Sequence, residues 1–484
     1  MAQPYEEPCS EGLIDAEPPQ DACAAMSRGK RALVLTACVL ASAMAFIDGS
    51  ALTVALPALR ADFGADLSSV QWVINGYVLA LASLTLIGGA LADVHGRVRM
   101  LTIGCLAFGA ASAACALAPS PGWLIGFRFL QGVAAAIVAP SSLALIGAIY
   151  PRAERNAAVG VWAAASALTT AGGPVLGGWL TDRFGWEAVF WINPPIAVAA
   201  VALLILLAPP DRRQKRGFDL AGAAILAASL GALAYGLSQI GSSETGHTVA
   251  AAQASEFFRT TITVPVVAGI AGIAAYAWWE TRAGEPMTPP RLAGNRPFVG
   301  LNLATLLIYS GLAIMFFLMP FELIDRRGLD ASQSGFVFLP FTLGVGLLSR
   351  LFGGIADRIG ARSMLVAGPI GAAIAYCWMA AGQGWQLSTG ILAPMSLLGF
   401  SFAVLVTPLT ATVLSSVDDN DEGLASGINN AASRIAQLAG VALASGLASL
   451  LSGYMVGLGV AAAATVAGAL VMALTVEPLP KEED

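Results

Sequence analysis

Charged residues are scarce in this sequence of 484 residues: they make up 12% of it, whereas apolar residues make up 57%. Ordinary soluble domains are about 25% charged and about 45–50% apolar. The mean hydropathy of +0.73 agrees with this imbalance. A water-soluble globular fold is therefore excluded, and we predict an integral membrane protein.

Lysine is almost absent, and so are the common catalytic motifs. The only lysines are Lys30, Lys215 and Lys481, and none precedes Ser or Thr, which excludes a P-loop for ATP. H-E-x-x-H and G-x-S-x-G are missing, and the six cysteines show no metal-ligand spacing. We expect no enzyme activity, no metal and no cofactor. A sensor or an intramembrane enzyme is a remote alternative.

Basic residues are also missing from the first 27 residues, which hold six acids and four prolines. A signal peptide needs a positively charged start, so this segment is not one. We interpret residues 1–30 as a disordered cytosolic tail.

Long apolar segments dominate the remaining chain, and each is long enough to cross a bilayer, which takes about 20 residues. We predict fourteen spans, near 32–57, 70–92, 100–119, 122–149, 157–180, 188–208, 218–240, 262–280, 298–323, 333–356, 363–381, 387–414, 424–452 and 454–476.

Arginine and lysine are distributed unequally between the two sides of these spans. With the N-terminus inside, 17 of the 25 lie in cytosolic segments and 5 in external ones. Cytosolic segments carry the excess of positive charge in membrane proteins. We therefore expect a multi-pass protein of the cell membrane with both termini in the cytoplasm.

An internal repeat divides the chain. "GGALADVHGRVRML" (88–101) and "GGIADRIGARSML" (353–365) share a pattern, and their aspartates, Asp93 and Asp357, are 264 residues apart. A second pair of matching segments is offset by 267. The near-constant offset predicts two six-helix halves of similar structure, with two further helices inserted between them.

The predicted fold class is all-α: fourteen transmembrane helices in two six-helix pseudo-symmetric bundles plus two inserted central helices. The first bundle covers residues 31–210, the insertion 211–285 and the second bundle 286–480. Parallel repeats of this kind build secondary transporters, whose site lies between the halves near the bilayer midplane.

Six sequence motifs lie in the predicted spans of the first bundle and in the loops between them. They are "FIDGSALTVALP" (46–57), "VQWVINGYVLA" (70–80), "GALADVHGRVRML" (89–101), "FRFLQG" (127–132), "TTAGGPVLGG" (169–178) and "GWEAVFWINPP" (185–195). Together they resemble the fourteen-helix drug/proton antiporter family of the major facilitator superfamily, over residues 30–476. The resemblance implies proton-coupled multidrug efflux by alternating access.

Four positions depart from the family pattern. Val94 and Val98 stand where the family usually has basic residues, so this loop carries fewer charges. Glu187 replaces the usual Arg, and Ala188 the second Trp.

Asp48 lies in the middle of an apolar stretch, about 24 Å along its helix from Ala32. Burial in hydrocarbon disfavours the charged carboxylate. We interpret Asp48 as a proton carrier; a hydrogen-bonded structural Asp is the alternative.

Arg128, at about the same depth on the fourth helix, is its expected partner, and the resemblance also assigns this Arg to proton handling. The alternatives are a fixed structural pair or an Arg128 side chain that reaches the outer interface.

Small residues line one face of the fifth helix: Gly173, Pro174, Gly177 and Gly178. Physically they predict close helix packing. The resemblance adds that this antiporter motif is associated with exporters.

Charges at the cytosolic ends of two helices suggest an inner gate formed by Asp93, Arg97, Asp357 and Arg358, in which a carboxylate pairs with an Arg or a helix N-terminus in one state only. Solvated loop charges are the alternative.

A central cavity for substrate is expected to include Trp72, Tyr77, Gln131, Tyr309, Phe316, Asn429 and Arg434. Aromatic rings would suit lipophilic or cationic compounds, although such rings also commonly face lipid or core. Arg434 either touches substrate or is a structural lock. Glu322 is expected at the membrane interface.

The sequence thus predicts a secondary transporter that exports a small amphipathic or lipophilic compound, a drug or secondary metabolite, in exchange for protons. A dedicated exporter of one endogenous metabolite is the alternative. The expected partners are this substrate, protons and the lipid bilayer. We expect no nucleic acid and a monomeric chain.

Overall fold

The computed structural model describes residues 26–209, 219–238, 258–283, 290–417, 422–448 and 453–476. They form helices and connecting turns. The long helices are α2 (Arg28–Phe63), α3 (Leu67–His95), α4 (Arg97–Ala116), α5 (Pro121–Ile149), α6 (Arg152–Phe184), α8 (Asn193–Leu207), α9 (Leu220–Ser238), α11 (Val264–Glu280), α13 (Arg296–Phe321), α15 (Leu339–Ile359), α16 (Ala361–Ala381), α17 (Ala393–Ser415), α18 (Glu422–Ala448) and α19 (Gly453–Thr475).

Short elements complete the described chain. They are α7 (Ala188–Trp191), α12 (Pro290–Ala293), α14 (Ala331–Val337) and three π-helical turns, η1 (Phe258–Thr263), η2 (Glu322–Arg326) and η3 (Ser388–Leu392). Within these residues, ten helical segments are long and apolar enough to cross a membrane. The expected span 333–356 is divided at Phe338: α14 ends at Val337, and a second helix, α15, begins at Leu339.

Local sequence explains where the first two long helices end and begin. Gly64 closes α2 in the left-handed conformation, with φ of 57°, which an L side chain rarely adopts. Asp66 then caps α3, because its side chain accepts a hydrogen bond from the Ser69 N–H at 2.9 Å. The hydrogen bonds from Ser69 hold the pKa of this carboxyl below its usual range.

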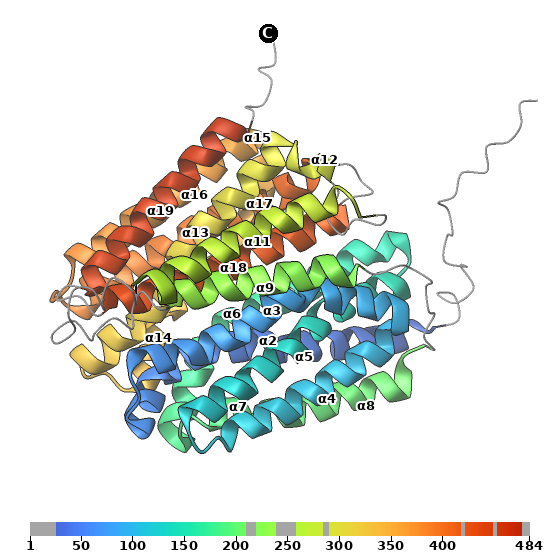
Figure 1. Ribbon diagram of the computed structural model, residues 1–484, viewed down its shortest axis with the longest axis horizontal. Coiled ribbons are helices and arrows are strands. Elements are labelled where there is room, and N and C mark those ends of the chain that lie inside the picture. The colour runs from blue at the N-terminus through green and yellow to red at the C-terminus, as the bar shows by residue number, and fades with distance from the viewer. Residues whose placement is uncertain are drawn as a thin grey trace, which may run out of the picture.

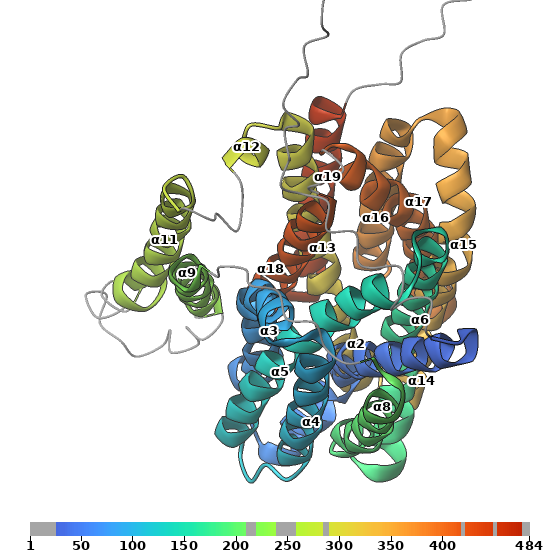
Figure 2. The same ribbon diagram turned by 90° about the vertical axis from the view of Figure 1, so that its right-hand side faces the viewer.

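The helices form two groups, which we call the first and second groups (Figure 1). The first consists of α2 to α8, where α2 packs on α6, α3 on α5, and α4 on α5 and α8. The second consists of α13 to α19, where α13 packs on α18 and α19, and α16 on α17 and α19. Figure 2 shows the two groups one above the other.

Helices α9 and α11 pair with each other at one side of the molecule (Figure 2). α9 contacts both α3 of the first group and α18 of the second. The Trp72 ring on α3 lies 6.2 Å from the Tyr235 ring on α9. Trp279 Nε1 of α11 donates to Asp219 Oδ2 at 2.8 Å. These two helices therefore lie over the seam between α3 and α18.

Contacts between the two groups gather at one face. We call the face where α2 begins the first face, and the face where it ends, at Phe63, the second face. At the second face α6 meets α14, and the Gln71 and Ser445 side chains join α3 to α18 by a hydrogen bond.

The seam between α6 and α14 is formed by backbone. A Cβ at Gly178 would overlap the Ala331 carbonyl, and a Cβ at Gly335 would overlap the Pro174 carbonyl. Asp182 of α6 adds a cap, because its carboxylate accepts from the N–H groups of Ala331 at 3.1 Å and Ser332 at 2.9 Å.

Candidate functional site: a buried ion pair between helices

The structure brings Asp48 and Arg128 together. Their side chains are 0% and 1% exposed, and Arg128 Nη1 donates to Asp48 Oδ2. The predicted partnership therefore has the required geometry, and the alternative of an Arg128 side chain that reaches the interface is wrong. A buried carboxylate without such a partner would be strongly unfavourable.

Two amides complete the surroundings of the Asp48 carboxylate. Gln131 Nε2 donates to Oδ1 at 2.9 Å, and Asn193 Nδ2 donates to the same oxygen at 3.2 Å. Asn193 also donates to Ser112 Oγ at 2.9 Å, and Ser112 in turn donates to the Phe190 carbonyl. Three donors to one carboxylate suit its ionised form.

Arg128 is held as firmly as its partner. Nε donates to the Val73 carbonyl at 3.0 Å, and Nη1 also donates to Gln131 Oε1 at 2.7 Å. The guanidinium lies 4.2 Å from the centre of the Tyr77 ring and 5.7 Å from that of Phe190. This pair and its supports all belong to the first group of helices.

Sequence reasoning placed Gln131 in the substrate cavity and overlooked Asn193. In the structure Gln131 is fully buried and bonded to both Asp48 and Arg128. A signal for Asn193 existed in "WINPP", because this amide lies within the predicted span 188–208, but it was given no partner. The structure makes Asn193 the first residue of α8, inside the protein.

Arg434 lies on α18, across from this cluster. Its guanidinium lies 5.8 Å from the centre of the Phe46 ring, and Phe46 precedes Asp48 by two residues on α2. Tyr77 and Tyr309 are near enough to interact with its charge. Its Nη1 donates to Gln437 Oε1 at 3.4 Å, and no carboxylate among the described residues pairs with it.

The predicted cavity aromatics separate into two places. Tyr309 and Phe316 belong to one row of rings in the second group, formed with Phe402, Phe341 and Phe338, with centroid separations of 5.1–6.1 Å. Trp72 packs instead on Tyr235 of α9, and its expected place in the cavity stays a prediction.

Asn429 bonds to neighbours within its own group. Its Nδ2 donates to Asn302 Oδ1 at 3.2 Å and Thr305 Oγ1 at 2.9 Å, which joins α18 to α13.

Of the four residues expected at the inner gate, the structure describes the side chain of Arg97 alone. Arg97 Nη1 donates to the Ala144 carbonyl at 3.1 Å. The side chains of Asp93, Asp357 and Arg358 lie outside the described part of the structure, so the predicted gate stays a prediction.

The fifth-helix motif lies at two seams. Gly173 and Gly177 face α2, where a Cβ would overlap Ser50 or the Ala51 carbonyl, while Pro174 and Gly178 face α14. The motif therefore allows close approach within the first group and between the two groups.

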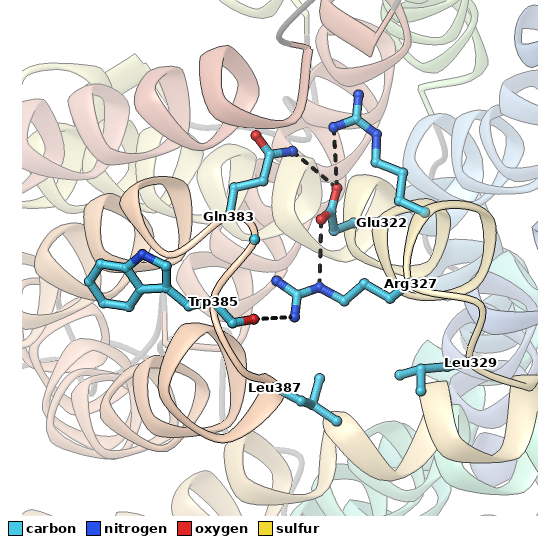
Figure 3. Close-up of a pocket in the computed structure, with 8 residues that line it drawn as sticks. Glu322, Arg327, Leu329, Gln383, Trp385 and Leu387 are labelled. Atoms are coloured by element: carbon cyan, nitrogen blue, oxygen red, sulfur yellow. Dashed lines mark hydrogen bonds and ion pairs between the residues drawn. The ribbon is translucent and has the colours of Figure 1, made fainter.

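Glu322 is the second carboxylate buried with arginines (Figure 3). It is 4% exposed and lies 3.7 Å from Arg326 Nη1 and 3.6 Å from Arg327 Nε. Gln383 Nε2 donates to it at 3.2 Å, and Arg327 Nη1 donates to the Trp385 carbonyl at 2.9 Å. Glu322 follows the last residue of α13 at the second face, and its expected interfacial position stays a prediction.

A pocket of ≈ 480 Å³ opens beside Glu322, at the second face and within the second group alone. Two guanidinium groups face one carboxylate there, which leaves the pocket with a net positive charge. We assign it the structural role of joining η2 to the turn before η3. Within the described residues, no group of three or more His, Cys, Asp or Glu is arranged to hold a metal.

Comparison with known proteins decides the family. The profile described as Major Facilitator Superfamily matches residues 38–440 and 301–484. The chain belongs to this superfamily. It is therefore a membrane transporter and not an enzyme.

Superfamily members with similar sequences carry names of drug resistance and export. "Multidrug resistance protein Stp" of Mycobacterium tuberculosis is 32% identical over 432 residues, which is 87% of this chain and 76% of that protein. "Cephamycin export protein CmcT" of Amycolatopsis lactamdurans is 34% identical, covering 83% and 82%. "Puromycin resistance protein pur8" of Streptomyces alboniger is 31% identical, covering 94% and 89%.

Solved transporter structures share the fold. A peptide transporter POT in complex with sulfate matches with a TM-score of 0.71 at 13% identity, covering 94% of this chain and 96% of the other. The xylose transporter XylE from E. coli matches with a TM-score of 0.63 at 13% identity, covering 92% and 99%. At such identities, the likeness concerns the fold alone.

Proposed function

We propose that this protein exports a small amphipathic compound in exchange for protons, by alternating access between the two helix groups. The observation that carries the proposal is the Asp48–Arg128 pair, a titratable carboxylate buried among membrane helices. Ionisable residues inside a membrane commonly mark proton pathways. The resistance and export names of its relatives support the direction of transport and the kind of compound.

The proposed topology has fourteen spans with both termini in the cytoplasm. The helices α3, α6, α9 and α18 would complete the ten segments already long and apolar enough. The first group would be the bundle of residues 31–210, the second that of 286–480, related by pseudo-symmetry, with 211–285 inserted. The first face is then cytosolic, and contacts at the second face describe a state closed to the outside.

The proposed proton carrier is Asp48. Protonation removes the charge that Arg128 compensates and weakens the hydrogen bonds that Gln131 and Asn193 donate. Each proton that enters across 100 mV supplies about 2.3 kcal/mol, and each pH unit adds about 1.4 kcal/mol. One proton therefore suffices for export against at least a tenfold gradient.

The proposed substrate is an antibiotic-like compound, because relatives are named for puromycin, lincomycin, tetracenomycin C and cephamycin. A panel of these four compounds separates a multidrug exporter from a dedicated one. Uptake of several indicates multidrug efflux, while uptake of one indicates a dedicated exporter. The protein is proposed to act as a monomer in the cell membrane.

The test uses inverted membrane vesicles with an acidic interior, in which export appears as uptake of the four compounds. We expect Asp48→Asn to abolish the dependence on the pH gradient, because an amide cannot carry the proton. Asp66→Asn is the control: this carboxyl is exposed, and Asn also caps a helix well. Full gradient-driven uptake by Asp48→Asn would refute the proposal.

A further inference from the structure

Arg434 of α18 is a positive charge with no counter-charge among the described residues. Its hydrogen bond to Gln437 Oε1 is long, at 3.4 Å, and goes to a neutral acceptor. A charge inside a membrane protein is costly unless it is paired or faces water. Since Arg does not deprotonate, it cannot relieve this cost by becoming neutral. An anion is therefore the missing part of this site.

The Asp48 carboxylate does not supply that anion. It is already bonded to Arg128, Gln131 and Asn193 within the first group. Arg434 instead contacts α2 at Phe46, whose ring centre lies 5.8 Å from the guanidinium. Residues two apart in a helix point in directions roughly 200° apart. Phe46 thus faces the second group, while Asp48 faces its own group.

Aromatic rings from both groups surround this contact. The Phe46 ring lies 6.3 Å from that of Trp162 on α6, and Trp162 Nε1 donates to Ser42 Oγ at 2.9 Å. In the second group, α13 packs on α18, and Tyr309 of α13 lies near enough to interact with the Arg434 charge. Phe46, Trp162 and Tyr309 are all partly exposed. Their rings therefore leave apolar surface next to the guanidinium.

Polar residues continue along the same face of α18. Asn430, Arg434 and Gln437 follow at intervals of four and three residues, which places them on one side of the helix. Asn430 is exposed, and the other two are partly exposed. Polar side chains in a spanning helix face the bundle interior or water, not lipid. The Phe46 contact directs this face toward the first group, so a compound between the groups would meet it.

We propose that Arg434 binds a carboxylate of the exported compound, so that the substrate class is an amphipathic acid with a flat apolar body. This inference rests on the function proposed above and narrows it. The guanidinium fork matches a carboxylate with two parallel hydrogen bonds. The rings of Phe46 and Tyr309 would pack against the apolar body. The membrane potential that drives protons inward also drives such an anion outward.

The test compares two probes that share one apolar body, anionic naphthylacetate and neutral naphthylacetamide of the same ring isomer. Calorimetry measures the Kd of each for the full-length protein in nanodiscs, and empty nanodiscs correct for partition into lipid. We expect the carboxylate to bind about tenfold more tightly than the amide, because hydrogen bonds between charged groups are roughly twice as strong as neutral ones.

The variants separate the charge from the rings. Arg434→Gln keeps a hydrogen-bond donor without the charge and should abolish the difference between the probes, while Arg434→Lys should keep most of it. Phe46→Ala should weaken both probes alike, because it removes a contact with their shared body. Arg362→Gln is the matched control: this arginine of the second group donates to the Ala473 carbonyl at 2.6 Å, and its loss should leave the ratio of affinities unchanged.

Equal affinity of the wild type for the two probes would overturn the inference, and so would a wild-type difference in Arg434→Gln. A purely structural Arg434 would give the second result together with a lower unfolding temperature. If Arg434→Gln does not fold, Arg434→Lys decides: a retained difference supports the inference and a lost one overturns it. Failure of the proposed function is distinct, because binding needs no pH gradient, and it appears as gradient-driven uptake by Asp48→Asn.

Discussion

At the scale of single residues, two neutral amides as well as Arg128 donate hydrogen bonds to the Asp48 carboxylate. Gln131 and Asn193 both donate to Oδ1, while Arg128 takes Oδ2. A hydrogen bond to a charged group contributes about 1.5–3 kcal/mol. The amides therefore influence how readily the carboxylate accepts a proton.

Asn193→Ala tests this directly. Removal of one donor weakens the ionised form, so we expect the pH profile of uptake to move to higher pH by about one unit. Gln383→Ala is the matched control, because it removes an amide from the other arginine-paired carboxylate, Glu322. An unchanged profile in Asn193→Ala, with normal thermal unfolding, would contradict the assigned role.

The pairing of Asp48 with Arg128 could be predicted from the sequence, because both lie at one depth in apolar helices and a lone charge there needs a partner. Asn193 could not, since it lies 145 residues from Asp48 and a short motif does not reveal that it begins α8 inside the protein. The partner of Trp72 was also hidden, because apolar periodicity does not say which neighbouring helix covers a face.

At the scale of elements, two neighbouring glycines of α6 contact two different helices. Gly177 contacts α2 in its own group, whereas Gly178 contacts α14 in the other group. A methyl group at Gly177 should therefore affect folding, and one at Gly178 should affect closure between the groups. Small residues allowed close packing to be predicted, but not which helix each glycine meets.

We expect Gly177→Ala to destabilise the protein by about 1–3 kcal/mol, because the added carbon overlaps backbone. Thermal unfolding in detergent measures this loss. Gly178→Ala should instead slow uptake and leave unfolding near the wild-type temperature. Gly172→Ala, where nothing lies within 4 Å of the added carbon, is the control and should change neither. Equal behaviour of the three variants would refute the two-seam arrangement.

At the scale of the whole molecule, the cap that Asp182 provides joins the two groups at the second face. Asp330 caps the same short helix from within the second group, where its side chain accepts from the Gln333 N–H at 2.6 Å. The two carboxylates thus serve one helix end, but only Asp182 crosses between the groups.

Asp182→Ala should shift the equilibrium toward the state open at the second face by about fivefold, since a lost helix cap costs about 1 kcal/mol. The spin-label distance between Phe184 and Phe336 reports the shift. Asp330→Ala should destabilise α14 but leave the spin-label distance between the two groups unchanged. A larger opening in Asp330→Ala than in Asp182→Ala would contradict this division.

The repeat, with its near-constant offset of 264–267 residues, predicts two halves, and the helices do pack in two groups. The division of the tenth expected span at Phe338 has a local signal that was overlooked, because Pro340 cannot donate a helical hydrogen bond. The docking of α14 against α6 from the other group was not predictable. Contacts of this kind depend on the relation between distant segments, which local hydropathy does not encode.

The one-sided position of α9 and α11 has a consequence for membrane-soluble compounds. These two helices wall off the α3–α18 seam from the surrounding lipid (Figure 2). The opposite seam, between α6 and α15, has no such cover among the described helices. A hydrophobic molecule in the surrounding bilayer would therefore reach the line where the two groups meet on the α6–α15 flank and be kept from it on the α9 flank.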